Sequence, residues 1–75
     1  GDHEVDLIVA RRDERIVALE VKLHGAVDDT DVRHLLWLRE QLGDDLLDAA
    51  VITAGDRAYR RMDGIAVIPA ALLGP

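Results

Sequence analysis

The chain has 75 residues, a formal net charge of −6, almost no aromatic residues and no cysteine. This length allows one small domain with a core of aliphatic side chains, and the lack of cysteine excludes disulfides and thiolate metal sites. No stretch is apolar enough to span a membrane and no signal peptide is visible, so we expect a cytoplasmic protein without membrane contact. The acidic balance argues against tight binding of DNA by the chain alone, because affinity for phosphates depends on Lys and Arg.

Two apolar runs near the start, Glu4–Ala10 and Arg15–Leu23, are typical of neighbouring strands. Because alternate side chains of a strand share a face, the hairpin should bring the odd-numbered hydrophobic residues of both runs together. A three-residue loop gives that register and sets Asp6 across from Glu20. A five-residue loop is also allowed and sets Asp6 across from Lys22. A loop of two or four residues would put the hydrophobic rows on opposite faces.

In either register two carboxylates and an ammonium group meet on one face of the sheet, at Asp6, Glu20 and Lys22. Two neighbouring carboxylates repel each other unless a cation lies between them, and hard oxygen ligands favour magnesium or manganese. A lysine beside such an ion can orient an attacking water or help to deprotonate it. The pattern therefore suits metal-assisted hydrolysis. The alternative is a polar patch on the solvent side of a half-buried sheet.

The next segment predicts an amphipathic helix. Asp29 or Thr30 can cap its start, and it should end at Leu42, before Gly43. Trp37 falls on the outer side, as ordinary amphipathic surface or as a docking residue. Apolar residues at helical spacing form one stripe along the helix: Val32, Leu35, Leu36, Leu38 and Leu42. We expect this stripe to pack on the face of the hairpin that carries the odd-numbered residues.

The remaining chain predicts two strands separated by a charged loop. Residues 47–54 should return as a strand parallel to the second strand, which completes a βαβ unit. Residues 65–68 predict a final short strand stopped by Pro69, and residues 70–73 a last helical turn. The loop or short helical turn between them, residues 57–64, contains the one basic cluster suited to a DNA contact: Arg57, Arg60 and Arg61.

The central strands carry apolar residues on both faces, but the sequence predicts only one long helix to cover them. A preceding helix, a preceding strand or a second copy of the chain is therefore expected on the other face. The chain also begins directly before its central hairpin, which suggests a piece of something longer.

An acid on one strand followed by Glu20-Val21-Lys22 on its hairpin partner resembles the PD-(D/E)XK nuclease superfamily. More narrowly, the chain is similar to the C-terminal domain of unknown function that follows the ATPase module in a family of prokaryotic AAA-type ATPases. The resemblance implies an α/β (α+β), restriction-endonuclease-like core of β-hairpin, helix, parallel strand and final short strand. The first helix and first strand of the family fold are missing from residues 1–75. The segments that carry the narrower resemblance are EVDLIV, IVALEVKL, the helix that ends at Leu42, residues 55–57 and the final IPAALL.

By this resemblance, Asp6 and Glu20 hold magnesium or manganese, Lys22 assists the attacking water, and Glu4 is a spare ligand. Residues 1–75 then form a single nuclease-like domain at the C-terminus of a larger ATPase and hydrolyse DNA phosphodiesters. The alternative is a non-catalytic interaction or regulatory module that keeps a vestigial motif. The expected partners are DNA, the upstream ATPase module and a second copy bound through the uncovered sheet face. The chain has no Gly-rich phosphate loop, so ATPase activity cannot reside in it.

Overall fold

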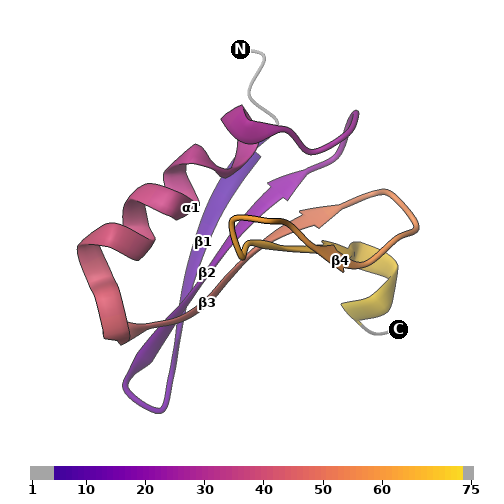
Figure 1. The fold of residues 1–75 in the computed structure, drawn as a ribbon. Coiled ribbons are helices and arrows are strands. Elements are labelled where there is room, and N and C mark those ends of the chain that lie inside the picture. The colour runs from indigo at the N-terminus through magenta and orange to yellow at the C-terminus, as the bar shows by residue number, and fades with distance from the viewer. Residues whose placement is uncertain (1–4, 74–75) are drawn as a thin grey trace.

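The computed structural model describes the backbone of residues 5–73 and their side chains except at positions 5–8, 10 and 12. Five strands form one mixed sheet in the order β1-β2-β3-β5-β4, and helix α1 lies across one face (Figure 1). The strands are β1 (Val5–Arg12), β2 (Arg15–Lys22), β3 (Leu46–Thr53), β4 (Tyr59–Arg60) and β5 (Ala66–Pro69). The helical segments are α1 (Asp29–Leu42) and two short 3₁₀ turns, η1 (Gly43–Asp45) and η2 (Ala70–Leu73).

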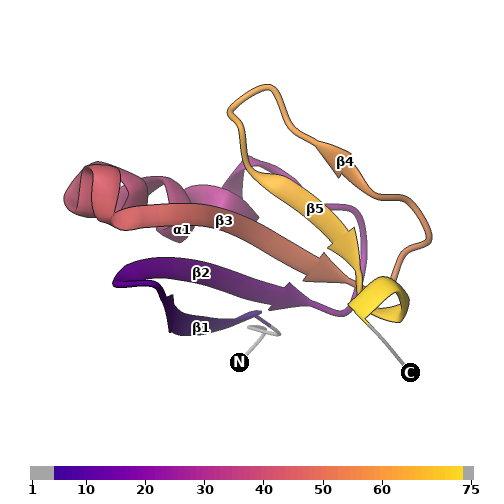
Figure 2. The same ribbon diagram turned by 90° about the horizontal axis from the view of Figure 1, so that it is seen from below.

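The chain follows the predicted order of a hairpin, a helix, a parallel strand and a final strand. β1 and β2 are antiparallel, β2 and β3 are parallel and joined through α1, and β5 pairs parallel to β3 (Figure 2). The small mixed α/β fold is therefore confirmed. The sequence missed β4, which pairs antiparallel to β5 within the stretch expected to be a loop or helical turn. Pro69 is the last residue of β5 rather than the residue that stops it.

The hairpin register differs from the expected one. The turn has two residues, Asp13 and Glu14, both with positive φ (51° and 66°), so that Arg12 pairs with Arg15. Positive φ at both central residues is the type I′ pattern, whose twist matches that of the flanking strands. The expectation of an odd-numbered loop was wrong because apolar residues occupy both parities of β1. After a shift of one residue, Ala10, Val9 and Ile8 still lie opposite the apolar residues Val17, Ala18 and Leu19.

Helix α1 packs on the even-numbered face of β2, whereas the odd-numbered face was expected. The predicted stripe does face the sheet, with Val32 and Leu35 fully buried. Beneath it lie Ala18 of β2 and Ala49 of β3, whose small side chains let the helix approach the sheet closely. The buried cluster consists of Ala18, Val32, Leu35, Ala49, Val51 and Ile65.

The opposite face of the sheet carries the odd-numbered residues of β2. Val17, Leu19 and Val21 are half-buried there, and α1, the only α-helix of residues 5–73, lies on the other side of the sheet. The proposal that a second copy covers this face stays a prediction. Trp37 projects from the outer side of α1, as expected, and its side chain is 58% exposed. No helix in the described part of the chain is long and apolar enough to cross a membrane.

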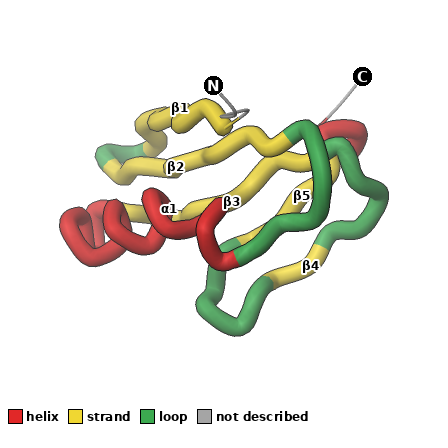
Figure 3. Tube along the Cα trace, turned by 90° about the horizontal axis from the view of Figure 1, so that it is seen from above, coloured by secondary structure: helices red, strands yellow, loops and turns green. Residues whose placement is uncertain are grey.

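The segments after β2 and β3 leave the sheet at the same end, because the two strands are parallel (Figure 3). Residues 23–28 lead from β2 into α1, and residues 54–58 lead from β3 into β4. The C-terminus of β2, where the Glu-x-Lys motif lies, therefore adjoins the first turn of α1.

Candidate functional site

Glu20 is a buried acid between β2 and α1. It pairs across the sheet with Leu7 and Val51, and its side chain is only 1% exposed. His34 of α1 lies above it, with the ring Nδ1 3.1 Å from Oε1 of Glu20. The second oxygen, Oε2, has no hydrogen-bond partner among the described residues. Within the described residues, only one of the two carboxylate oxygens of Glu20 thus has a hydrogen-bond partner, although the side chain is closed to solvent.

Burial raises the pKa of Glu20 above its ordinary value, because the ionised form loses its hydration. The neighbouring His34 lowers the pKa of Glu20 but does not cancel this effect, and Asp31 raises it further. Folding therefore shifts this carboxyl group toward protonation, relative to an exposed glutamate. Such a shift is a feature of functional sites and also of structural buried acids.

Lys22 ends β2 and reaches the first turn of α1. Its Nζ lies 2.5 Å from Oδ2 of Asp31 and 2.9 Å from the carbonyl oxygen of Ala26. The side chains of Lys22 and Asp31 are 17% and 12% exposed. Burial alone would raise the pKa of Asp31, but the hydrogen bonds from Lys22 and from the backbone N–H of Asp28 lower it overall. The structure therefore holds Lys22 in a shielded ion pair with α1.

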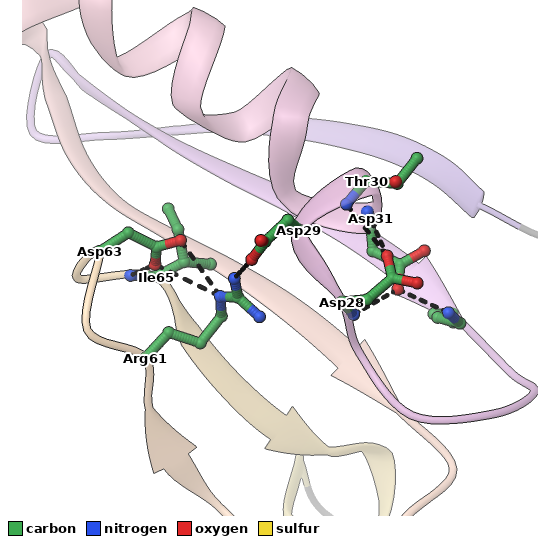
Figure 4. Close-up of polar contacts among 8 residues, drawn as sticks. Asp28, Asp29, Thr30, Asp31, Arg61, Asp63 and Ile65 are labelled. Carbon is green, nitrogen blue, oxygen red and sulfur yellow. Dashed lines mark hydrogen bonds and ion pairs between the residues drawn. The ribbon is translucent and has the colours of Figure 1, made fainter.

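Asp28 and Asp31 form the N-terminal cap of α1 (Figure 4). The Asp28 carboxylate accepts from the backbone N–H groups of Thr30 and Asp31, at 3.0 and 3.2 Å. The Asp31 carboxylate accepts in turn from the N–H of Asp28, at 2.8 Å. This is a capping box in which Asp28 is the cap, instead of the expected Asp29 or Thr30. Asp31 thus holds the helix end and Lys22 at the same time.

The register separates the position of Asp6 from the Glu-x-Lys pair. Asp6 pairs with Val21, whereas it was expected across from Glu20 or Lys22. Because alternate positions of a strand belong to opposite faces, the two-residue turn moves Asp6 out of the row of Glu20 and Lys22. The side chain of Asp6 and the whole of Glu4 lie outside the described residues. Their assignment as magnesium or manganese ligands stays a prediction.

The described part of the site does not fit a hard cation. Magnesium requires about six oxygen ligands in octahedral geometry. No group of three or more His, Asp or Glu side chains that could hold a metal ion occurs among the described residues. Glu20 contributes one oxygen that already contacts His34, and Asp31 is bound by Lys22. Glu20 and Lys22 share the helix-covered face, but there Glu20 contacts His34 and Lys22 contacts Asp31, both residues of α1.

The basic cluster near the C-terminus is largely neutralised within the chain. Arg60 pairs with Asp48 at 3.3 Å. Arg61 bridges Asp29 and Asp63 (Figure 4), and the hydrogen bond from its guanidinium to Asp29 raises the pKa of Arg61. Arg60 and Arg61 are therefore bound to acids of the same domain and do not form a free basic surface with Arg57.

Sequence reasoning missed His34 as a neighbour of Glu20. His34 lies three residues after Asp31 and thus on the same side of α1. With the helix placed on the even-numbered face of β2, this spacing would have brought His34 toward Glu20 and Asp31 toward Lys22. What the sequence did not indicate was therefore the face of β2 that α1 covers.

A family model described as a domain of unknown function (DUF4143) matches residues 1–73. No curated protein and no solved structure matches the chain. The resemblance to a domain of unknown function is confirmed in this coarser form, whereas kinship with the PD-(D/E)XK nucleases stays a prediction. Since the match spans nearly the whole chain, the protein belongs to the DUF4143 family.

Proposed function

We propose that this domain is a non-catalytic interaction or regulatory module of an AAA-type ATPase and that it retains the Glu-x-Lys motif in a structural role. The observation that carries the proposal is the engagement of both motif residues by α1, through His34 on Glu20 and Asp31 on Lys22. A catalytic pair has to reach a substrate and an ion, but these side chains lie beneath the helix. The ATPase context rests on the sequence resemblance.

A structural role has a clear physical basis at Lys22. Charge-assisted hydrogen bonds in shielded sites contribute about 1.5–3 kcal/mol, more than pairs on an open surface. The contacts of Lys22 with Asp31 and with the carbonyl of Ala26 tie β2 to the loop and first turn that follow it. Lys22 therefore fixes where α1 begins relative to the sheet.

The charge distribution also supports protein contacts over DNA. Affinity for phosphate backbones depends on unneutralised Lys and Arg, and salt weakens it steeply. The chain has a net charge of −6, and Arg60 and Arg61 are paired with acids of the same domain. A DNA-cutting domain would need a basic surface supplied by another part of the protein.

The second candidate function is metal-dependent hydrolysis of DNA by a restriction-endonuclease-like domain. It is favoured by one observation, the unpartnered Oε2 of the buried Glu20, two residues from Lys22 on the same strand face. In this proposal Asp6 and Glu20 would hold the magnesium or manganese ion, which would supply Lewis-acid chemistry, and Lys22 would lie beside it. Lys22 would first have to leave Asp31.

Titration with magnesium or manganese, followed by NMR, separates the two functions. The interaction module predicts no selective response of the Asp6, Glu20 and Lys22 signals at millimolar metal, and no cleavage of plasmid DNA. A saturable response of these signals, together with cleavage that a folded Lys22→Ala variant has lost, would establish the nuclease instead. Cross-linking within the longer protein that the resemblance implies then tests contact between this domain and the ATPase module.

A further inference from the structure

A pocket of about 200 Å³ lies on the helix side of the sheet, beyond the start of α1. Its floor includes Val67 and Tyr59, which pair with each other, and Val67 also pairs with the core residue Val51. Its walls come from residues 25–27 and 55–57. These residues belong to the two loops that leave the sheet at the same end (Figure 3). Helix α1 contacts β2 and β3, so this end of the face is left to the loops.

The size of the pocket decides what kind of ligand fits it. Sites for small molecules and cofactors usually measure about 300–1,000 Å³. A space of about 200 Å³ suits a single large side chain better than a whole cofactor. The aliphatic and aromatic surfaces of Val27, Val67 and Tyr59 favour an apolar group.

Two charged side chains, Arg57 and Asp56, line the edge of the pocket. Arg57 lines the pocket and, in contrast to Arg60 and Arg61, has no ion pair or hydrogen bond with the described residues. Its neighbour Asp56 lines the same wall without pairing with it. A guanidinium group attracts a carboxylate of an occupant, and a carboxylate accepts hydrogen bonds from main-chain N–H groups.

The wall loops also carry free main-chain groups. Among the described residues, no backbone-to-backbone hydrogen bond involves residues 25–27 or 56–58. The carbonyl of Ala26 accepts from Lys22, and the N–H of Gly55 donates to the Thr53 hydroxyl oxygen. The other polar groups of these loops are available to a backbone laid between them.

We infer that this pocket binds an extended segment of a partner protein, with one aliphatic side chain inserted over Tyr59 and Val67 and an adjacent acidic residue on Arg57. The inference rests on the proposed function, since it gives the interaction module its contact site. The apolar side chain supplies most of the affinity, because a rim ion pair exposed to solvent contributes little.

The probes are three capped tetrapeptides, Ala-Leu-Glu-Ala, Ala-Leu-Lys-Ala and Ala-Ala-Glu-Ala, titrated into the ¹⁵N-labelled 75-residue chain. We expect the Leu-Glu peptide to bind most tightly and to shift the amide signals of Gly25, Val27, Gly55 and Tyr59. No binding, equal binding of all three, or shifts elsewhere on the domain would overturn the inference. So would a short single-stranded DNA that shifts the same signals more strongly than the peptides.

Two variants close the pocket without touching the core. Ala26→Trp enlarges an exposed residue of one wall. Gly55→Leu enlarges the other wall, where an added Cβ meets Thr53 Oγ1 at an ordinary 3.5 Å. Each should weaken the Leu-Glu peptide about tenfold or more, as expected when a buried apolar side chain loses its site. Unchanged affinity in both variants, with unchanged melting temperatures, would contradict the inference.

Arg57→Gln should weaken the Leu-Glu peptide about two- to fivefold and leave the Leu-Lys peptide unweakened. Arg33→Gln is the matched control, because Arg33 is exposed outside the pocket lining, and it should change neither affinity. If the peptides fail while the domain still cross-links to the ATPase module, the pocket is refuted and the proposed function stands. Metal-dependent DNA cleavage by the domain would instead refute the proposed function.

Discussion

Replacing Lys22 by Met removes the ammonium group and keeps most of the aliphatic stem. The substitution leaves Asp31 partly buried without its ion-pair partner. The two side chains are 17% and 12% exposed, so solvent screens their interaction weakly. We expect a loss of about 1.5–3 kcal/mol in the free energy of unfolding. For a domain of this size, the melting temperature should fall by roughly 10 °C.

The pH dependence of this loss identifies its cause. Hydrogen bonds from Lys22 and Asp28 lower the pKa of Asp31 in the folded state, so the pair stabilises the domain above the ordinary value of 3.8. That contribution disappears as the pH falls through the lowered pKa of folded Asp31, where the carboxylate becomes protonated. The difference in the free energy of unfolding between wild type and Lys22→Met, measured in urea, should therefore be largest at pH 7 and should shrink below pH 3.8.

A control variant and a double-mutant cycle test whether the loss comes from the pair of Lys22 and Asp31. Arg33→Met changes an exposed charge on the outer side of α1 and should alter stability by less than about 0.5 kcal/mol. In a double-mutant cycle with Asp31→Asn, the coupling energy between the two sites should account for most of the loss. If Lys22→Met is as stable as the wild type at pH 7, the structural role assigned to Lys22 is refuted.

Three further changes test other parts of the fold by thermal and urea unfolding. Glu20→Gln should raise stability by about 1 kcal/mol at pH 7, because it removes the cost of a buried carboxylate. Because burial raises the pKa of Glu20, this gain in the free energy of unfolding should vanish as the pH falls below the ordinary value of 4.5. A Glu20→Gln variant that is less stable than the wild type at pH 7 would contradict the argument. Asp28→Ala removes the cap of α1 and should cost about 0.5–2 kcal/mol, whereas Asp44→Ala beyond the helix should not. Leu35→Ala removes a fully buried side chain and should lower the free energy of unfolding by about 2–5 kcal/mol. A smaller loss would mean that neighbouring side chains move into the space that Leu35 leaves.

The order of the elements was predictable because it depends on local signals. Hydrophobic periodicity located the strands and the helix, and Gly43, with φ of 53°, ends α1 as its sequence position indicated. The parallel return of β3 followed from the strand–helix–strand order alone. The outward position of Trp37 followed from helical geometry.

The site was less predictable because it depends on a register that the sequence leaves open. Leu7, Ile8 and Val9 form a continuous apolar stretch, so both parities of β1 can face an apolar partner. Turn chemistry then decided the pairing, and Asp13 with Glu14 is not an obvious type I′ sequence. One residue of register moved Asp6 out of the row of Glu20, and α1 covers that row instead of the odd-numbered face.

The most direct test of the central claim is a magnesium titration of the ¹⁵N-labelled chain that follows the Glu20 and Lys22 signals. We predict that neither signal responds selectively at millimolar magnesium, because both side chains are bound to α1. A saturable shift of both signals, accompanied by release of Lys22 from Asp31, would contradict the structural role of the motif.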